Sequence, residues 1–111
     1  MDDRVLTTNA MLHALDPLAL APEDVLSGSP QAEITELDQV GGIGVGIWQL
    51  TAGTVRDIET DEVFVVLAGR ATLTFEGESP IELTPGVVVR LRAGDRTTWE
   101  VHETLRKVYI G

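Results

Sequence analysis

The stretch Glu59-Thr-Asp-Glu-Val-Phe-Val-Val-Leu-Ala-Gly-Arg70 decides the fold prediction for this chain. Its middle is rich in β-branched and aromatic residues, which is typical of a buried strand. Alternation along that strand places Glu62, Phe64 and Val66 on one face, so we expect a carboxylate among apolar side chains. We predict that this strand ends in a tight connection at Ala68-Gly69.

Short runs with strand character continue on both sides of this stretch, separated by turn residues. Turn signals every ~8–12 residues indicate an all-β sandwich or barrel. The predicted strands are a short one around Ala32 and Ile34, then Ile47–Leu50, Glu62–Leu67, Arg70–Phe75, Ile81–Leu83, Val87–Leu91, Thr97–Val101 and Leu105–Ile110.

The first part of the chain has a different pattern. Apolar residues before Pro17 have partial helical spacing, but the proline interrupts it. Pro22, followed by two acidic residues, predicts a single helical turn. We therefore divide the chain into an N-terminal arm, residues 1–30, and a β-barrel domain, residues 31–111. The arm is expected to pack on the barrel or on a partner subunit.

Composition limits the possible functions. A chain of 111 residues with 43% apolar content is one globular domain. Without cysteine it has neither disulfides nor thiolate metal ligands. A net charge of −10 repels nucleic acid and anionic membranes, so we expect neither as a partner. No signal-peptide pattern or membrane-spanning run is present, and a cytoplasmic location is expected.

Two sequence frames give this chain a family resemblance. Glu62, six residues and Gly69 fit the second half of the first motif of the cupin superfamily. The histidines of that motif fall on Arg56 and Ile58, or on the residue before each. In the second motif, Thr97 stands where the ligand histidine is expected. The chain thus resembles a cupin, and of the four usual metal-ligand positions only Glu62 keeps a ligand.

A closer resemblance is to small cupins of the ureidoglycine-aminohydrolase type. It covers roughly Val45 to Tyr109, and the segment from Trp99 to Tyr109 carries most of it. This resemblance implies a cupin double-stranded β-helix, a small jelly-roll-like barrel preceded by the N-terminal arm. It also implies a homodimer, formed through a strand face or exchanged N-terminal strands.

Glu62 is the candidate catalytic residue. The cupin frame implies that its carboxylate points into the barrel, where it must be paired, bind a metal or shift its pKa upward. One interpretation is a metal ligand or general base. The other is a structural carboxylate that is bonded to a neighbouring Arg, Thr or Trp.

The candidate ligand-binding residues are those that the frame brings near Glu62. A hydroxyl and indole rings beside a carboxylate make a small pocket with an apolar wall. Both tryptophans could instead be core residues with a satisfied N–H. Arg56 could pair with Glu62 or bind a substrate carboxylate. The set is Trp48, Arg56, Phe64, Thr97 and Trp99.

We predict no metal site and no cofactor. If a divalent metal did bind, its ligands would be Glu62 with Glu59 or Asp61, through oxygen atoms. The two histidines, His13 in the arm and His102 on an exposed turn or edge, lie outside both motifs. The basic pair Arg106-Lys107 is too small to bind nucleic acid.

Three functions remain open from the sequence. The first is a cupin that binds a small polar, nitrogen-rich metabolite near Glu62, with hydrolase or isomerase chemistry suggested by the resemblance. The second is a non-catalytic ligand-binding or sensor module. The third is a structural homodimer with a vestigial pocket.

Overall fold

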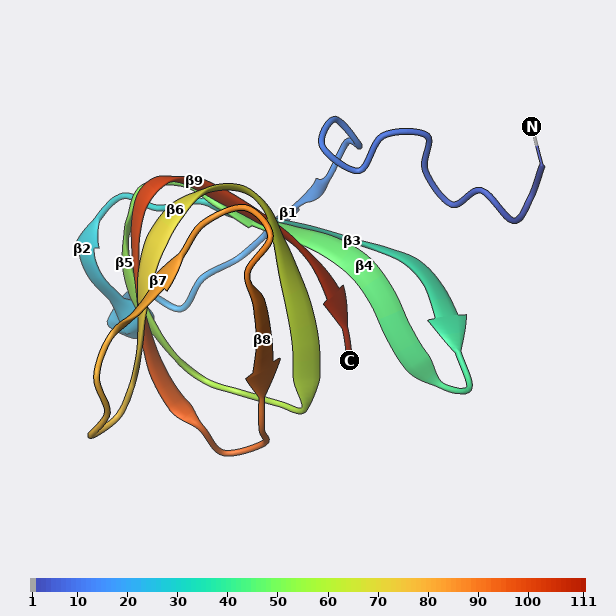
Figure 1. Cartoon of the computed structure of the whole chain (residues 1–111). Coiled ribbons are helices and arrows are strands. Elements are labelled where there is room, and N and C mark those ends of the chain that lie inside the picture. Colours follow the sequence, from blue (N-terminus) through green and yellow to red (C-terminus); the bar gives the residue numbers. More distant parts are fainter. Residues whose placement is uncertain (1) are drawn as a thin grey trace.

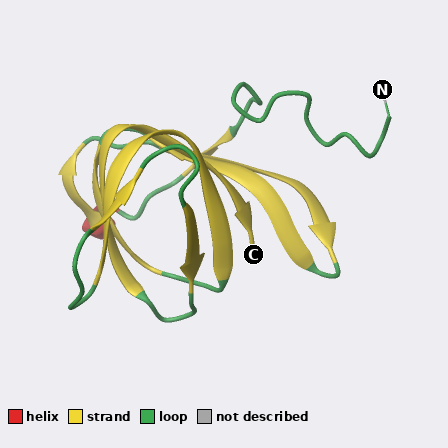
Figure 2. Ribbon diagram, viewed as in Figure 1, coloured by secondary structure: helices red, strands yellow, loops and turns green. Residues whose placement is uncertain are grey.

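The computed structural model describes residues 2–111, and strands make up almost all of its regular structure (Figure 2). The only helical element in this range is the 3-10 turn η1 (Pro22–Asp24), which agrees with the single helical turn predicted at Pro22. The strands are β1 (Asp16–Leu18), β2 (Val25–Gly28), β3 (Ala32–Val40), β4 (Ile43–Leu50), β5 (Gly53–Ile58), β6 (Glu62–Phe75), β7 (Ile81–Leu83), β8 (Val88–Leu91) and β9 (Arg96–Ile110).

These strands form one strongly curled antiparallel sheet. Its main path runs β1-β3-β4-β9-β5-β2, and β6 pairs with β9 as well as with β7 and β8. Figure 1 shows the curled part as a barrel, with the β3–β4 hairpin and the N-terminal end extending away from it. The extents of the molecule are 44 × 26 × 26 Å, which reflects these projections. The all-β barrel prediction is confirmed.

β6 and β9 are longer than the sequence indicated. The predicted connection at Ala68-Gly69 is wrong, because β6 continues through it with register shifts against β9. Gly69 has φ 91°, and a Cβ there would lie 2.0 Å from the carbonyl oxygen of Thr104. A glycine with positive φ serves a β-bulge as well as a turn, so its presence alone did not distinguish them.

The bulge reverses which residues of β6 face the interior. Before it Phe64 and Val66 are buried, and after it Ala71 and Leu73 are buried. The even-numbered positions therefore face inward first, and the odd-numbered positions do so later. In the same way, the two strands predicted after Arg96 are one continuous strand, β9.

Two parts of the sheet were not expected from the sequence. β5 was not predicted as a strand, yet it pairs with both β2 and β9. Within the N-terminal arm, β1 pairs with β3 and β2 pairs with β5. Parts of residues 1–30 thus belong to the same sheet as the barrel.

The core fills the barrel with aliphatic and aromatic side chains. Its fully buried members include Leu50, Phe64, Leu73, Leu91 and Leu105. None of the helical structure in residues 2–111 has the length and apolar character needed to span a membrane.

Candidate functional site

A cavity of about 500 Å³ lies where the N-terminal arm meets one end of the barrel. Its wall on the barrel side includes Trp48, Glu62, Trp99 and Lys107, and the arm supplies Leu18–Ala21. A larger groove of about 620 Å³ runs beside it, but that groove touches neither Glu62 nor Lys107. We therefore take the smaller cavity as the candidate ligand pocket.

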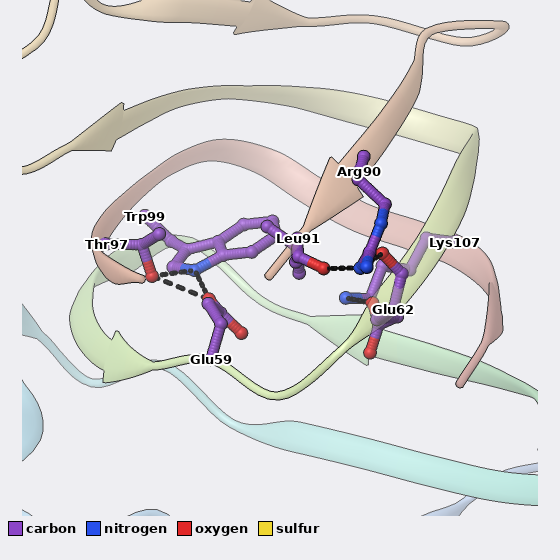
Figure 3. Close-up of polar contacts among 7 residues, drawn as sticks. All are labelled: Glu59, Glu62, Arg90, Leu91, Thr97, Trp99 and Lys107. Carbon is purple, nitrogen blue, oxygen red and sulfur yellow. Dashed lines mark hydrogen bonds and ion pairs between the residues drawn. The ribbon is translucent and has the colours of Figure 1, made fainter. Parts of the chain in front are cut away.

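Lys107 and Glu62 form an ion pair in the wall of this pocket. The Nζ of Lys107 lies 2.7 Å from Oε2 of Glu62, and the two side chains are 6% and 18% exposed (Figure 3). Lys107 is the only lysine of the chain. A buried ammonium is costly unless a carboxylate or a comparable partner compensates its charge.

Three aromatic rings surround the same ammonium. Its nitrogen lies 4.6 Å from the ring centroid of Trp48, 4.4 Å from that of Phe64 and 4.9 Å from that of Trp99. At such distances a ring face attracts a cation, by about 2 kcal/mol where water is excluded. Glu62 and the rings together therefore hold Lys107 as a cation at the pocket wall.

Glu59 is a second buried carboxylate, located in the loop between β5 and β6. Its Oε2 accepts hydrogen bonds from Oγ1 of Thr97 at 2.6 Å and from Nε1 of Trp99 at 3.1 Å (Figure 3). The loop itself is fixed by backbone bonds to Gly94 and Asp95, which join it to the loop before β9.

The environment of Glu59 favours its protonated form. Burial raises its pKa above the ordinary value of 4.5, and the nearby charge of Asp57 adds to this effect. The hydrogen bonds from Thr97 and Trp99 and the positive charge of Lys107 act in the opposite direction. A carboxyl group with a raised pKa can hold a proton nearer neutral pH and exchange it with a bound molecule.

Several predicted site residues do meet at the pocket. Glu62 faces it from β6, and Trp48 and Trp99 line it from β4 and β9. Phe64 is fully buried and does not line the pocket, but it packs against the ammonium of Lys107 and the ring of Trp99. Both tryptophans thus belong to the apolar wall and to the packing around the core.

Other predicted residues lie differently. The hydroxyl of Thr97 and the indole N–H of Trp99 donate hydrogen bonds to Glu59 and not to Glu62. Arg56 is at the rim, where it pairs with Asp24 at 3.2 Å instead of Glu62. The partner of Glu62 is Lys107, for which the sequence had indicated only a basic pair too small to bind nucleic acid.

Residues outside the pocket also differ from the predictions in part. Asp61 is exposed and pairs with Arg90 at 3.0 Å. His102 lies within β9, not on a turn, half-buried and 3.0 Å from Oγ1 of Thr72. His13 contacts Thr7 within the arm at 3.0 Å.

A sequence signal for Lys107 was present. It alternates with Leu105 and Tyr109, so it occupies an inward position on a strand whose inward neighbours are apolar or aromatic. A single lysine at such a position is expected to have a specific partner. No comparable signal marked Glu59, because its burial depends on two loops that meet in space.

The donor set does not fit the metal that the cupin resemblance implies. No cluster of three His, Asp or Glu side chains occurs among residues 2–111. Glu62, the one remaining ligand position, already binds the ammonium of Lys107. A divalent cation at that carboxylate would have to overcome repulsion from a positive charge held beside it.

Comparison with known proteins agrees with the fold. Residues 37–109 match the EutQ-like cupin domain family. A protein of unknown function from Pseudomonas syringae pv. tomato superposes with a TM-score of 0.77 at 24% identity, over 89% of this chain and 44% of its own. The present chain therefore spans less than half the length of that protein.

Two further structures cover more of their own length. The EutQ protein of Clostridium difficile has a TM-score of 0.64 at 17% identity, over 84% of this chain and 79% of its own. A protein of unknown function from Rhizobium leguminosarum bv. viciae has a TM-score of 0.64 at 23% identity, over 71% of this chain and 78% of its own. No curated protein matches the chain. Because the family model covers the barrel from β3 to β9, this chain belongs to the EutQ-like cupin domain family.

Proposed function

We propose that this cupin binds a small polar metabolite in the pocket beside Glu62 and Lys107, without a metal ion. The observation that carries the proposal is the single lysine of the chain, buried in a ring of aromatic side chains at the wall of a cavity of about 500 Å³. Small-molecule sites combine such apolar walls with a few fixed polar groups.

The balance of charges in the pocket suggests the chemistry of the ligand. Glu62 is paired with Lys107, and Asp24 is paired with Arg56. Glu59 receives hydrogen bonds only from neutral groups among the described residues. A ligand that carries an N–H group or a positive charge would complete the bonding of Glu59. We therefore propose a nitrogen-containing metabolite.

The sequence resemblance to ureidoglycine-aminohydrolase-type cupins also favours a nitrogen-rich ligand. The comparisons give no support for a hydrolase of that kind, so the proposed function is ligand binding. Glu62→Gln separates the two cases. In an enzyme that uses this carboxylate the change abolishes turnover, whereas in a sensor it weakens binding only.

The lone lysine provides a direct test of ligand binding. In protein labelled with 13C-lysine, one side-chain signal reports on Lys107. We expect ethanolamine or glycinamide to shift that signal saturably, and acetate to leave it unchanged. Glu59→Gln should weaken this response, because the amide, unlike the carboxyl group, cannot give up a proton to pair with a cationic nitrogen.

The control is Glu78→Gln, which changes an exposed carboxylate in the turn after β6. It should respond to the probes as the unmodified protein does. A Lys107 signal that no probe moves would contradict the proposal. A stronger response to acetate than to the amines would contradict the nitrogen-containing ligand.

We also propose that the chain forms the homodimer that the resemblance implies. Apolar side chains at the tip of the β3–β4 hairpin support this, since Val40 is 67% exposed and Ile43 is 52% exposed. Light scattering at micromolar concentration should give twice the mass of the chain. A monomer mass at that concentration would rule out a stable dimer.

A further inference from the structure

The N-terminal arm contributes one wall of the ligand pocket. Leu18–Ala21 face the cavity that Trp48 and Trp99 line from the barrel. Leu20 also packs against the core cluster. The size and the opening of the pocket therefore depend on where the arm lies.

Arg106 fixes the preceding part of the arm against the barrel. It lies on β9 next to Lys107 but on the opposite face, and it is only 9% exposed. Its Nε donates to the carbonyl oxygen of Ala10 at 2.9 Å, and Nη2 donates to the carbonyl oxygen of His13. Nη1 donates to Oε1 of Gln49 on β4 at 2.9 Å.

This guanidinium has no carboxylate partner within salt-bridge distance among the described residues. A buried charge of this kind depends on full hydrogen bonding. Two of its three acceptors belong to the arm, so detachment of the arm would leave Arg106 largely unsatisfied. Its hydrogen bonds thus favour the docked arm directly.

The other contacts of residues 2–21 are weak, whereas β2, near the end of the arm, pairs with β5. β1 has three residues, lies at the edge of the sheet and pairs only with β3, supported by a hydrogen bond of 3.3 Å from Thr35 to Asp16. None of residues 2–21 is fully buried. Segments with few buried contacts open at a lower free energy than the core does.

We propose that residues 2–21 of the arm are a movable wall of the pocket, latched by Arg106, and that their release opens the pocket to ligands. Arg106 is a positioning residue in this arrangement, since it acts on the pocket only through the arm. The inference rests on the proposed function for what enters the pocket. Its test needs no ligand, so the two can fail separately.

The two tryptophans of the chain make the test possible, because both line this pocket. Their fluorescence therefore reports how open it is. In Arg106→Ala we expect a shift of the emission to longer wavelength and an increase of about twofold in the acrylamide quenching constant, as the local opening becomes more populated. Amide exchange in residues 10–18 should rise about tenfold, with exchange in β6 and β9 nearly unchanged.

The matched control is Arg70→Ala, which removes an exposed arginine whose partner is Glu103 at 3.9 Å. It should leave quenching and amide exchange as they are. A second variant, Leu20→Ala, weakens the arm from its own side without changing β9. It keeps the proposal testable if Arg106→Ala does not fold, and it should also increase quenching.

Two results would overturn the inference. One is unchanged quenching and unchanged exchange in the arm in the folded variants. The other is a quenching constant of the unmodified protein that changes with protein concentration, because the wall would then come from the arm of a second copy. Quenching that is independent of concentration and rises in both variants would support the intrachain latch.

Discussion

Arg106 and Lys107 are neighbours on β9, and both cations are buried, but on opposite faces of the strand. The inner face compensates Lys107 with a carboxylate and three aromatic rings. The outer face compensates Arg106 with two carbonyl oxygens of the arm and one side-chain amide. The inner arrangement is part of the barrel, whereas two of the three outer contacts exist only while the arm is docked.

This difference predicts different consequences when each charge is removed. Loss of the inner cation leaves the charged carboxylate of Glu62 unpaired in the barrel wall, which lowers the free energy of global unfolding. Loss of the outer cation leaves only neutral carbonyl groups, which water can satisfy once the arm moves. The inner pair should therefore govern global stability, and the outer contacts should govern local opening.

The largest effect is expected from Lys107→Met. The uncharged methionine side chain occupies the space between the three aromatic rings and leaves Glu62 unpaired. This should lower the free energy of unfolding by about 3 kcal/mol. Urea denaturation measures this change. Removing both charges in Lys107→Met with Glu62→Met should recover most of the loss. A single variant as stable as the unmodified protein would show that the ion pair contributes nothing.

Gly69→Ala should lower the free energy of unfolding by somewhat less, about 2 kcal/mol, because a Cβ at positive φ collides with the backbone of Thr104. The bulge around Gly69 faces the β9 segment that leads to Arg106 and Lys107. The same change should therefore disturb both faces. Thermal unfolding and tryptophan quenching together check this prediction. Gly77→Ala provides the control, since a Cβ at that positive-φ turn residue meets nothing within 4 Å.

The smallest expected effect is the pH dependence of stability that comes from Glu59, a residue of the pocket side of the barrel. Because the pKa of Glu59 is raised by burial, the native state holds a proton that the unfolded chain releases near its ordinary value of 4.5. Glu59 thus contributes stability that is present below that pH and is lost as pH rises through the raised pKa. Replacing it by Gln keeps a neutral acceptor for Thr97 and Trp99.

The difference in unfolding free energy between the unmodified protein and Glu59→Gln should therefore fall as pH rises from about 4.5 toward neutral. The matched difference for Glu78→Gln, an exposed carboxylate, should stay flat. A difference for Glu59→Gln that is equally flat would mean that burial does not raise the pKa of this carboxyl group.

Much of the fold could be predicted from the chain, and less of the site. Turn residues and alternation identified most strands, and the cupin frame identified Glu62 as an inward residue at the pocket. The continuity of β6 and β9 was missed because a glycine in a bulge resembles a glycine in a turn. Lys107 was overlooked because it was considered only as half of a basic pair with Arg106, and that pair was too small to bind nucleic acid.

The sequence by itself determined the all-β barrel and the absence of the histidine ligands, because alternation, turn chemistry and motif spacing are properties of neighbouring residues. Only the tertiary structure decided which carboxylate pairs with Lys107, which one Thr97 and Trp99 bind, and which segment covers Arg106. Each of those contacts joins residues 38 to 96 positions apart in the chain. Local sequence does not predict such distant contacts, because they depend on how the long strands bend and where the arm docks.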